Sequence, residues 1–186
     1  MLGFLITLLS FDNSITMKKL ILMFFLTPIQ IFAQEKVSNV EFEGSKTIIL
    51  HGDERNFQVS GILSTGEKIS TFCSHGACFF RIEYKGRSIE QTVGYDITDL
   101  TIYEYDFGGD GDKELVVINN ISETSFIYIY SYSRGIISEL FEKEIKYYQA
   151  IIKVNYIEYY MPSGLDTVWN YYQGKFWKMT PVRIEK

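Results

Sequence analysis

The feature that most constrains the fold of this chain is a regular succession of short β-rich runs separated by turn residues. From residue 36 onward the runs are rich in Ile, Val, Thr, Tyr and Phe, and turn residues recur every ~8–12 positions. This spacing favours an all-β fold of antiparallel sheets, arranged as a sandwich or as partial propeller-like blades, over alternating strands and helices. The run SFIYIYSYS (125–133) alternates almost strictly and so places four aromatic side chains on one face, namely Phe126, Tyr128, Tyr130 and Tyr132.

One segment leaves its secondary structure open. ISELFEKEIKYYQAI (137–151) has some apolar residues three and four positions apart, as an amphipathic helix requires. A strand and a short helix fit this segment equally well, so the sequence predicts at most one short helix.

The N-terminal segment is typical of an export signal. MKKLILMFFLTPIQIFAQEK begins at Met17 with two lysines and an apolar core, and it offers a cleavage point between Ala33 and Gln34. We interpret residues 1–16 as an extension from a start codon placed too early. The apolar run is shorter than the ~20 residues of a membrane span, although an uncleaved anchor is the alternative. We therefore expect a signal peptide at 1–33 and one β-rich domain at 34–186, secreted or periplasmic and free of the membrane after cleavage.

The charge balance excludes some partners. The formal net charge is −5, and removal of Lys18, Lys19 and Asp12 with the signal leaves −6. No block of basic residues is present, which argues against nucleic acid and against an anionic membrane surface as partners.

The two cysteines, Cys73 and Cys78 in CSHGAC, predict a disulfide because an exported chain meets an oxidising compartment. His75 lies between them, but two cysteines and one histidine are too few for a closed zinc site. A reactive cysteine–histidine pair would lack a third, orienting group.

An acidic turn is the strongest functional signal. YDFGGDGDKELVVI (105–118) crowds four acidic residues and three glycines into nine positions directly before an apolar run. Oxygen ligands at alternate positions, with a glycine at the sixth, suit a hard cation that takes six to eight oxygens. We expect one Ca²⁺ site in which carboxylates and one main-chain carbonyl, that of Asp112, bind the ion; its residues are Asp106, Asp110, Asp112 and Glu114. A solvated hairpin turn that binds no ion is the competing interpretation.

This turn is not an EF-hand, because Val117 stands at the twelfth position, where a bidentate glutamate is needed. It resembles the calcium loop of FG-GAP and VCBS-type repeats over about residues 100–130, with the D-x-D-x-D-G-x-x-[DE]-L pattern matched at Asp106, Asp110, Gly111, Glu114 and Leu115. The resemblance implies a calcium-binding hairpin of the kind carried on propeller blades of exported proteins. Gly108 replaces one ligand of the pattern, which should weaken affinity, and the chain is too short for a full propeller of four-stranded blades.

Catalytic signatures are missing from the sequence. It contains no G-x-S-x-G elbow and no H-E-x-x-H, and its two histidines are His51 and His75. We therefore expect a non-enzymatic binding or interaction module with a structural calcium loop, whose partner is a protein or a carbohydrate. The tyrosine-rich runs, Trp169 and Trp177 are candidates for an aromatic contact surface or for the core. The alternative is a periplasmic inhibitor or immunity-type protein that blocks a partner protein, and an enzyme using scattered carboxylates is a third class.

Overall fold

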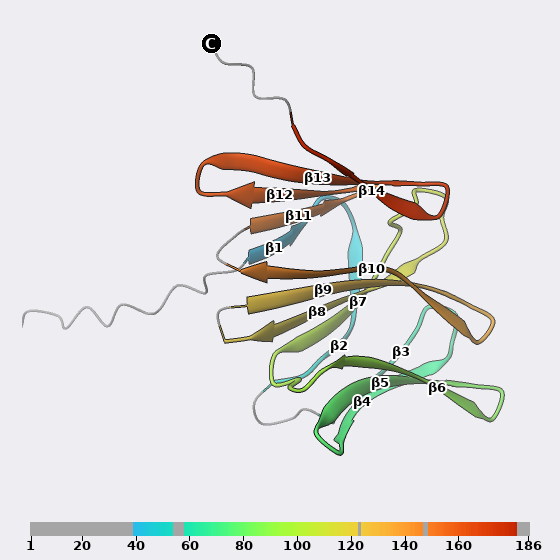
Figure 1. The fold of residues 1–186 in the computed structure, drawn as a ribbon. Helices are drawn as coiled ribbons and strands as arrows, with labels where there is room; N and C mark the ends of the chain where they lie inside the picture. Colours follow the sequence, from blue (N-terminus) through green and yellow to red (C-terminus); the bar gives the residue numbers. More distant parts are fainter. Residues whose placement is uncertain (1–38, 54–57, 123, 147–148, 182–186) are drawn as a thin grey trace, which may run out of the picture. The chain divides into compact units, whose positions relative to one another are not determined.

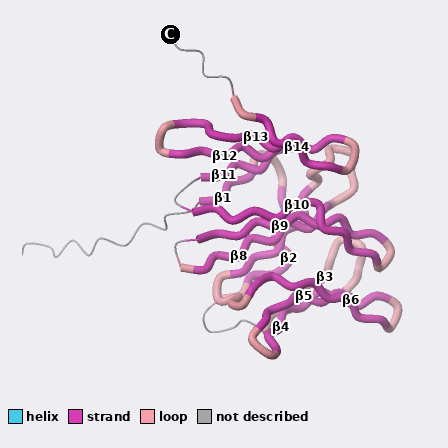
Figure 2. Tube along the Cα trace, in the orientation of Figure 1, coloured by secondary structure: helices cyan, strands magenta, loops and turns pink. Residues whose placement is uncertain are grey.

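The alternating runs of the sequence form strands throughout the described part of the chain (Figure 1). The computed structural model describes residues 39–53, 58–122, 124–146 and 149–181, and these ranges hold fourteen strands and no helix (Figure 2). The all-β prediction is confirmed. The predicted signal peptide at 1–33 lies outside the described residues, which all belong to the unit Lys36–Lys186. In the part of the chain with assigned structure, no helix has the length and hydrophobicity needed to cross a membrane.

The strands form three sheets. A central sheet has the order β10-β9-β8-β7-β2, with all neighbours antiparallel. Its strands are β2 (Lys46–His51), β7 (Leu100–Tyr105), β8 (Glu114–Ile121), β9 (Thr124–Ser133) and β10 (Ile136–Lys146).

The central sheet is buried on both faces, which explains why β8 reads as a continuous apolar run. Leu115 and Val117 belong to one hydrophobic core, shared with the four-stranded sheet described next. Val116 and Ile118 belong to a second core, shared with the C-terminal sheet. Successive side chains of a strand point to opposite faces, so a strand between two cores must be apolar at every position. The alternation predicted for residues 125–133 is confirmed, since Tyr128 and Tyr130 belong to the first core.

The four-stranded sheet covers the first face of the central sheet and has the order β3-β4-β5-β6. Its strands are β3 (Ser60–Ile62), β4 (Lys68–Ser74), β5 (Ala77–Tyr84) and β6 (Arg87–Gly94). The turn from β4 to β5 is His75-Gly76 and the turn from β5 to β6 is Lys85-Gly86, with positive φ at all four residues. Two-residue turns of this kind match the twist of a hairpin.

The C-terminal sheet covers the second face and has the order β1-β11-β12-β13-β14. Its strands are β1 (Asn39–Phe42), β11 (Gln149–Lys153), β12 (Tyr156–Met161), β13 (Gly164–Tyr172) and β14 (Lys175–Met179). The pair β1–β11 is parallel, so this sheet is mixed where we expected purely antiparallel pairing. The run IIKVNYIEYYM is two strands, because Val154 and Asn155 form a turn with Asn155 at a φ of 68°.

The segment whose structure the sequence left open, 137–151, is extended. It contributes to β10 and to the start of β11, with no helix in its described residues. The side chains Phe141 and Ile145 of β10 enter the core between the central and C-terminal sheets. Packing of this face therefore decides the conformation of a segment whose local pattern was ambiguous.

Candidate functional site

The acidic turn connects β7 and β8, two adjacent strands of the central sheet. The register of these strands ends at the pair Tyr105 and Glu114. Phe107 anchors the turn, because its side chain is 0% exposed and its ring lies 5.4 Å from that of Tyr171 and 5.2 Å from that of Phe176. Its main-chain oxygen accepts a hydrogen bond of 2.7 Å from the amide of Asn155. The turn is therefore fixed to the C-terminal sheet at its first positions.

Asp106 organises the rest of the turn. Its Oδ1 accepts hydrogen bonds from the amides of Gly109 at 2.7 Å and Asp110 at 3.1 Å, and its Oδ2 accepts one from Gly111 at 3.1 Å. Three amides thus converge on one carboxylate, which is how an aspartate stabilises a tight turn. Gly111 has a φ of 92°, a conformation that favours glycine. The turn therefore bends sharply at Gly111.

Glu114 closes the turn from its far end. Glu114 is 7% exposed, and its Oε2 accepts hydrogen bonds from the amides of Phe107 at 2.8 Å and Gly108 at 3.3 Å. Burial raises the pKa of Glu114, the amides oppose that rise, and the negative charge of Asp110 adds to it. Repulsion between the charges of Asp110 and Glu114 is thus the smallest of these contributions.

Asp110 and Asp112 are the exposed carboxylates of the turn. Oδ1 of Asp110 accepts a hydrogen bond of 3.0 Å from the amide of Asp112. A Cβ at Gly108 would lie 3.5 Å from the Asp110 carboxylate. Gly108 is the third position of the repeat pattern, so a ligand side chain at this position would lie beside Asp110.

The donor atoms of this turn suit a metal ion, but their arrangement does not yet form a binding site. Its donors are all oxygens, which a hard cation such as Ca²⁺ prefers. However, no three His, Cys, Asp or Glu side chains in the described ranges are grouped so that they could hold an ion. Asp106, Asp110 and Glu114 accept hydrogen bonds from the turn's own amides instead. Uptake of an ion would require the exposed Asp110 and Asp112 to change position.

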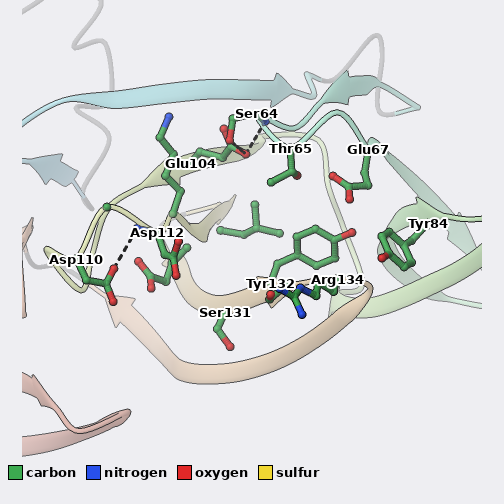
Figure 3. Close-up of a pocket in the computed structure, with 15 residues that line it drawn as sticks. Ser64, Thr65, Glu67, Tyr84, Glu104, Asp110, Asp112, Ser131, Tyr132 and Arg134 are labelled. Carbon is green, nitrogen blue, oxygen red and sulfur yellow. Dashed lines mark hydrogen bonds between the residues drawn. The ribbon is translucent and has the colours of Figure 1, made fainter.

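A cavity of about 530 Å³ adjoins the turn (Figure 3). It lies on the side of the central sheet that faces the four-stranded sheet, because Leu115 lines it and belongs to their shared core. Its walls come from the turn between β3 and β4, the end of β5, Glu104 of β7, the acidic turn and the end of β9. Asp110 and Asp112 are therefore shared by the acidic turn and the cavity.

Two glutamates of this cavity, Glu67 and Glu104, are not among the residues predicted from the sequence, and Tyr132 is predicted only as a member of a tyrosine-rich run. Glu104 is 4% exposed, and its Oε1 accepts hydrogen bonds from the amide of Ser64 at 2.8 Å and from the Ser64 hydroxyl at 3.0 Å. Glu67 and Tyr132 face the same space from other elements (Figure 3). One sequence feature could have indicated this site. Glu104 is the charged residue in the otherwise uncharged run LTIYEY, and a charged side chain in a buried strand is unusual.

The remaining predicted residues are accounted for separately. Cys73 and Cys78 form a disulfide across β4 and β5, as predicted. Nδ1 of His51 lies 2.7 Å from Oγ1 of Thr101, and Nδ1 of His75 lies 2.7 Å from Oγ of Ser74. Both histidines thus have hydroxyl partners.

The two tryptophans have different environments. Trp169 packs against the core between the central and C-terminal sheets, with its ring 5.6 Å from Phe141. Trp177 is 59% exposed on β14. Trp177 is therefore the one of the two that is available to a partner.

Fold and site together define an all-β chain of three layered sheets with an acidic turn beside a polar cavity. No family model, no curated protein and no solved structure matches this chain.

Proposed function

We propose that this chain is a non-enzymatic binding domain whose acidic turn takes up one Ca²⁺ ion with a structural role. The observation that carries the proposal is the confinement of four carboxylates to Asp106–Glu114, where the charge of Asp110 adds to the raised pKa of the buried Glu114. Each close like-charge pair near a wet surface costs on the order of 1 kcal/mol or more. A bound divalent cation would convert this repulsion into attraction.

The residues that would hold the ion are those of the turn itself. Asp106, Asp110 and Glu114 would supply carboxylate oxygens, and Asp112 would supply its main-chain carbonyl oxygen. Asp106 and Glu114 are already fixed by amides of the turn, so ordering of the exposed Asp110 and Asp112 would account for most of the entropic cost. The ion would stiffen the connection between two central strands and one rim of the cavity.

Calorimetry tests this proposal. We expect the processed domain to release or absorb heat on titration with millimolar CaCl₂, and to melt several degrees higher in calcium than in chelator. Asp110→Asn should weaken the response at least tenfold, whereas Asp166→Asn, a matched change on β13 whose hydrogen bond from Thr167 can persist, should not. Identical melting curves in calcium and in chelator, with no heat of binding, would refute the calcium site.

Export belongs to the same proposal. The disulfide Cys73–Cys78 supports an oxidising compartment. N-terminal sequencing of the protein recovered from the periplasm or the medium should begin at Gln34. Recovery of a chain that keeps residues 17–33 in the membrane fraction would favour the uncleaved anchor.

An inhibitor or immunity-type protein is the second candidate, and one surface favours it. Tyr172, Trp177 and Met179 are 62%, 59% and 46% exposed in the hairpin of β13 and β14. Large exposed aromatic side chains are typical anchors of protein interfaces. Crosslinking from position 177 should then yield one discrete protein adduct, and Trp177→Ala should abolish the complex in gel filtration. Retention on a glycan array instead would identify a carbohydrate partner.

A further inference from the structure

The cavity beside the acidic turn collects polar atoms that the protein leaves without partners. Within the described ranges, four buried side-chain oxygens have no hydrogen bond of good geometry. Three of them, Oε2 of Glu67, Oε2 of Glu104 and the hydroxyl of Tyr132, belong to residues that line this one cavity. Glu67 and Tyr132 lie close enough to interact with each other, so Oε2 of Glu104 is the atom that most needs a donor from outside the chain. A buried polar group without a partner costs ~1–3 kcal/mol, and more if it is charged. Such atoms are rare in folded proteins, so their concentration at one place needs an explanation.

Glu104 is the decisive residue. Its side chain is only 4% exposed, and it projects from the end of β7 next to the acidic turn, opposite Leu115 in the register. Ser64 satisfies its Oε1 through two hydrogen bonds, and no donor in the described part of the chain reaches its Oε2. A buried carboxylate is stabilised only when it is paired with a cation or fully hydrogen-bonded. One half of this carboxylate still lacks a donor.

The charge of the cavity points to a cationic partner. Five carboxylates line it, those of Glu67, Glu104, Asp110, Asp112 and Glu114, against the two cations Lys113 and Arg134. Among the described residues, neither of these cations forms an ion pair with the five carboxylates. The formal charge of the lining is therefore −3, and a partly enclosed acidic wall attracts cations strongly.

Aromatic rings complete the cavity. Tyr84 at the end of β5 and Tyr132 on β9 both line it, and Figure 3 shows their rings on the same side as the Glu67 carboxylate. Burial and then the charge of Glu67 raise the pKa of Tyr132 to about 12, so its phenol is neutral at physiological pH and can donate or accept a hydrogen bond. Neutral tyrosine rings attract flat cations through their faces.

We propose that this cavity binds a guanidinium group, either of an arginine side chain in a partner or of a free guanidino compound. A guanidinium is planar, permanently charged and carries five N–H donors, so it can donate to several acceptors while it stacks on a ring. The carboxylates of Glu67 and Glu104 and the hydroxyl of Tyr132 come from three separate elements around about 530 Å³. That spread suits a wide, flat donor better than a compact ammonium. Glu67 and Glu104 lie outside the acidic turn, so guanidinium binding can be tested without calcium, although the turn supplies three of the five carboxylates of the lining.

Isothermal titration of the processed domain in chelator tests the proposal and separates it from the calcium site. The probes are agmatine and the peptide acetyl-Gly-Arg-Gly-amide, with the citrulline peptide as a neutral isostere and the lysine peptide as an ammonium control. We expect saturable binding of at least one guanidinium probe, at least tenfold weaker binding of the lysine peptide, and none of the citrulline peptide. Binding of agmatine alone would assign a free small molecule, and tighter binding of the arginine peptide would assign a protein side chain.

Three matched variants locate the site. Glu104→Gln and Glu67→Gln remove one charge each and should weaken guanidinium binding at least tenfold, because a charge-assisted hydrogen bond is lost. Glu144→Gln, on an exposed position of β10 outside the cavity, should bind within twofold of the unaltered protein. If Glu104→Gln fails to fold, Glu67→Gln at the more accessible β3–β4 turn decides the question.

The proposal is overturned by any of three results. The first is no saturable binding of either guanidinium probe up to about 10 mM, since a weaker affinity is not specific recognition. The second is binding of the citrulline peptide with the same affinity as the arginine peptide. The third is unchanged affinity in the cavity variants that fold. None of these three results decides whether the acidic turn binds calcium, which the separate calcium titration tests.

Discussion

Phe107 is the side chain through which the acidic turn is fixed to the rest of the fold, and its truncation to alanine is the sharpest test of that role. The ring is fully buried and contacts three aromatic rings, with centroids 5.2 Å away at Phe176, 5.4 Å at Tyr171 and 6.4 Å at Tyr105. Removing it opens a cavity in the core between the central and C-terminal sheets.

The expected cost can be worked from this environment. Phenylalanine-to-alanine changes at fully buried sites lower the free energy of unfolding by ~3–5 kcal/mol. We expect about 4 kcal/mol for Phe107→Ala, since strands of two sheets surround the site and limit collapse. For a domain of this size, that loss lowers the melting temperature by ~8–16 °C. It is also a large part of a total stability on the order of 5–15 kcal/mol.

Urea unfolding followed by tryptophan fluorescence measures this loss directly, because Trp169 packs against the same core. Phe72→Ala is the matched control: this ring is half-buried in the four-stranded sheet and stacks on Phe79 at 5.3 Å. We expect it to cost about 1 kcal/mol. A loss below about 1.5 kcal/mol for Phe107→Ala, or one no larger than that of Phe72→Ala, would refute the anchoring role.

Three further predictions follow from other parts of the fold. Reduction of Cys73–Cys78, which closes a loop with a sequence separation of only 5, should lower the stability by about 2 kcal/mol and the melting temperature by ~4–8 °C; a loss of all structure in reductant would contradict this. Burial, and then the charges of Glu142 and Glu139, raise the pKa of Tyr128 from 10.0 to about 12. Below pH 10 both folded and unfolded chains keep this proton, and above it the unfolded chain loses the proton first, so stability should fall between pH 10 and pH 12; a fall of the same size in Tyr128→Phe would disprove it. Gly61→Ala should destabilise the domain by ~1–3 kcal/mol, because the new Cβ would lie 2.2 Å from the main-chain oxygen of Ile49; an unchanged urea midpoint would show that β3 can move away.

Local sequence patterns were sufficient for the strands and most turns. Strict alternation assigned SFIYIYSYS to a strand with both faces specified, and x-Gly pairs such as Lys85-Gly86 marked the hairpins. The turn at Val154-Asn155 has no clear sequence signal because it contains no glycine, although asparagine tolerates the positive φ found there. The segment 137–151 could not be decided locally because its apolar residues fit either period, and burial against the C-terminal sheet selected the strand.

Pairing between distant strands lay beyond the sequence. Nothing in NVEF (39–42) indicates that it pairs in parallel with QAII (149–152). Main-chain hydrogen bonds use the same groups in every strand, so they do not specify which strand is the partner. The acidic turn was found because its four carboxylates lie within one short segment. The cavity beside it was missed because Glu67, Glu104 and Tyr132 lie far apart in the chain and meet only when the central and four-stranded sheets come together.

The parallel pair β1–β11 also has a kinetic consequence. As the chain leaves the ribosome, residues 39–42 emerge early, and the strand they need is made only after both other sheets. Joining them closes a very long loop, and the entropic cost of loop closure grows slowly with loop length, so this long-range pairing slows folding. Until β11 has been made, both edges of β1 are unpaired. The C-terminal sheet can therefore be completed only after synthesis of most of the chain. A nascent chain stalled before Gln149 should therefore remain sensitive to protease near its N-terminal end, and release of the full chain should confer resistance as a late event.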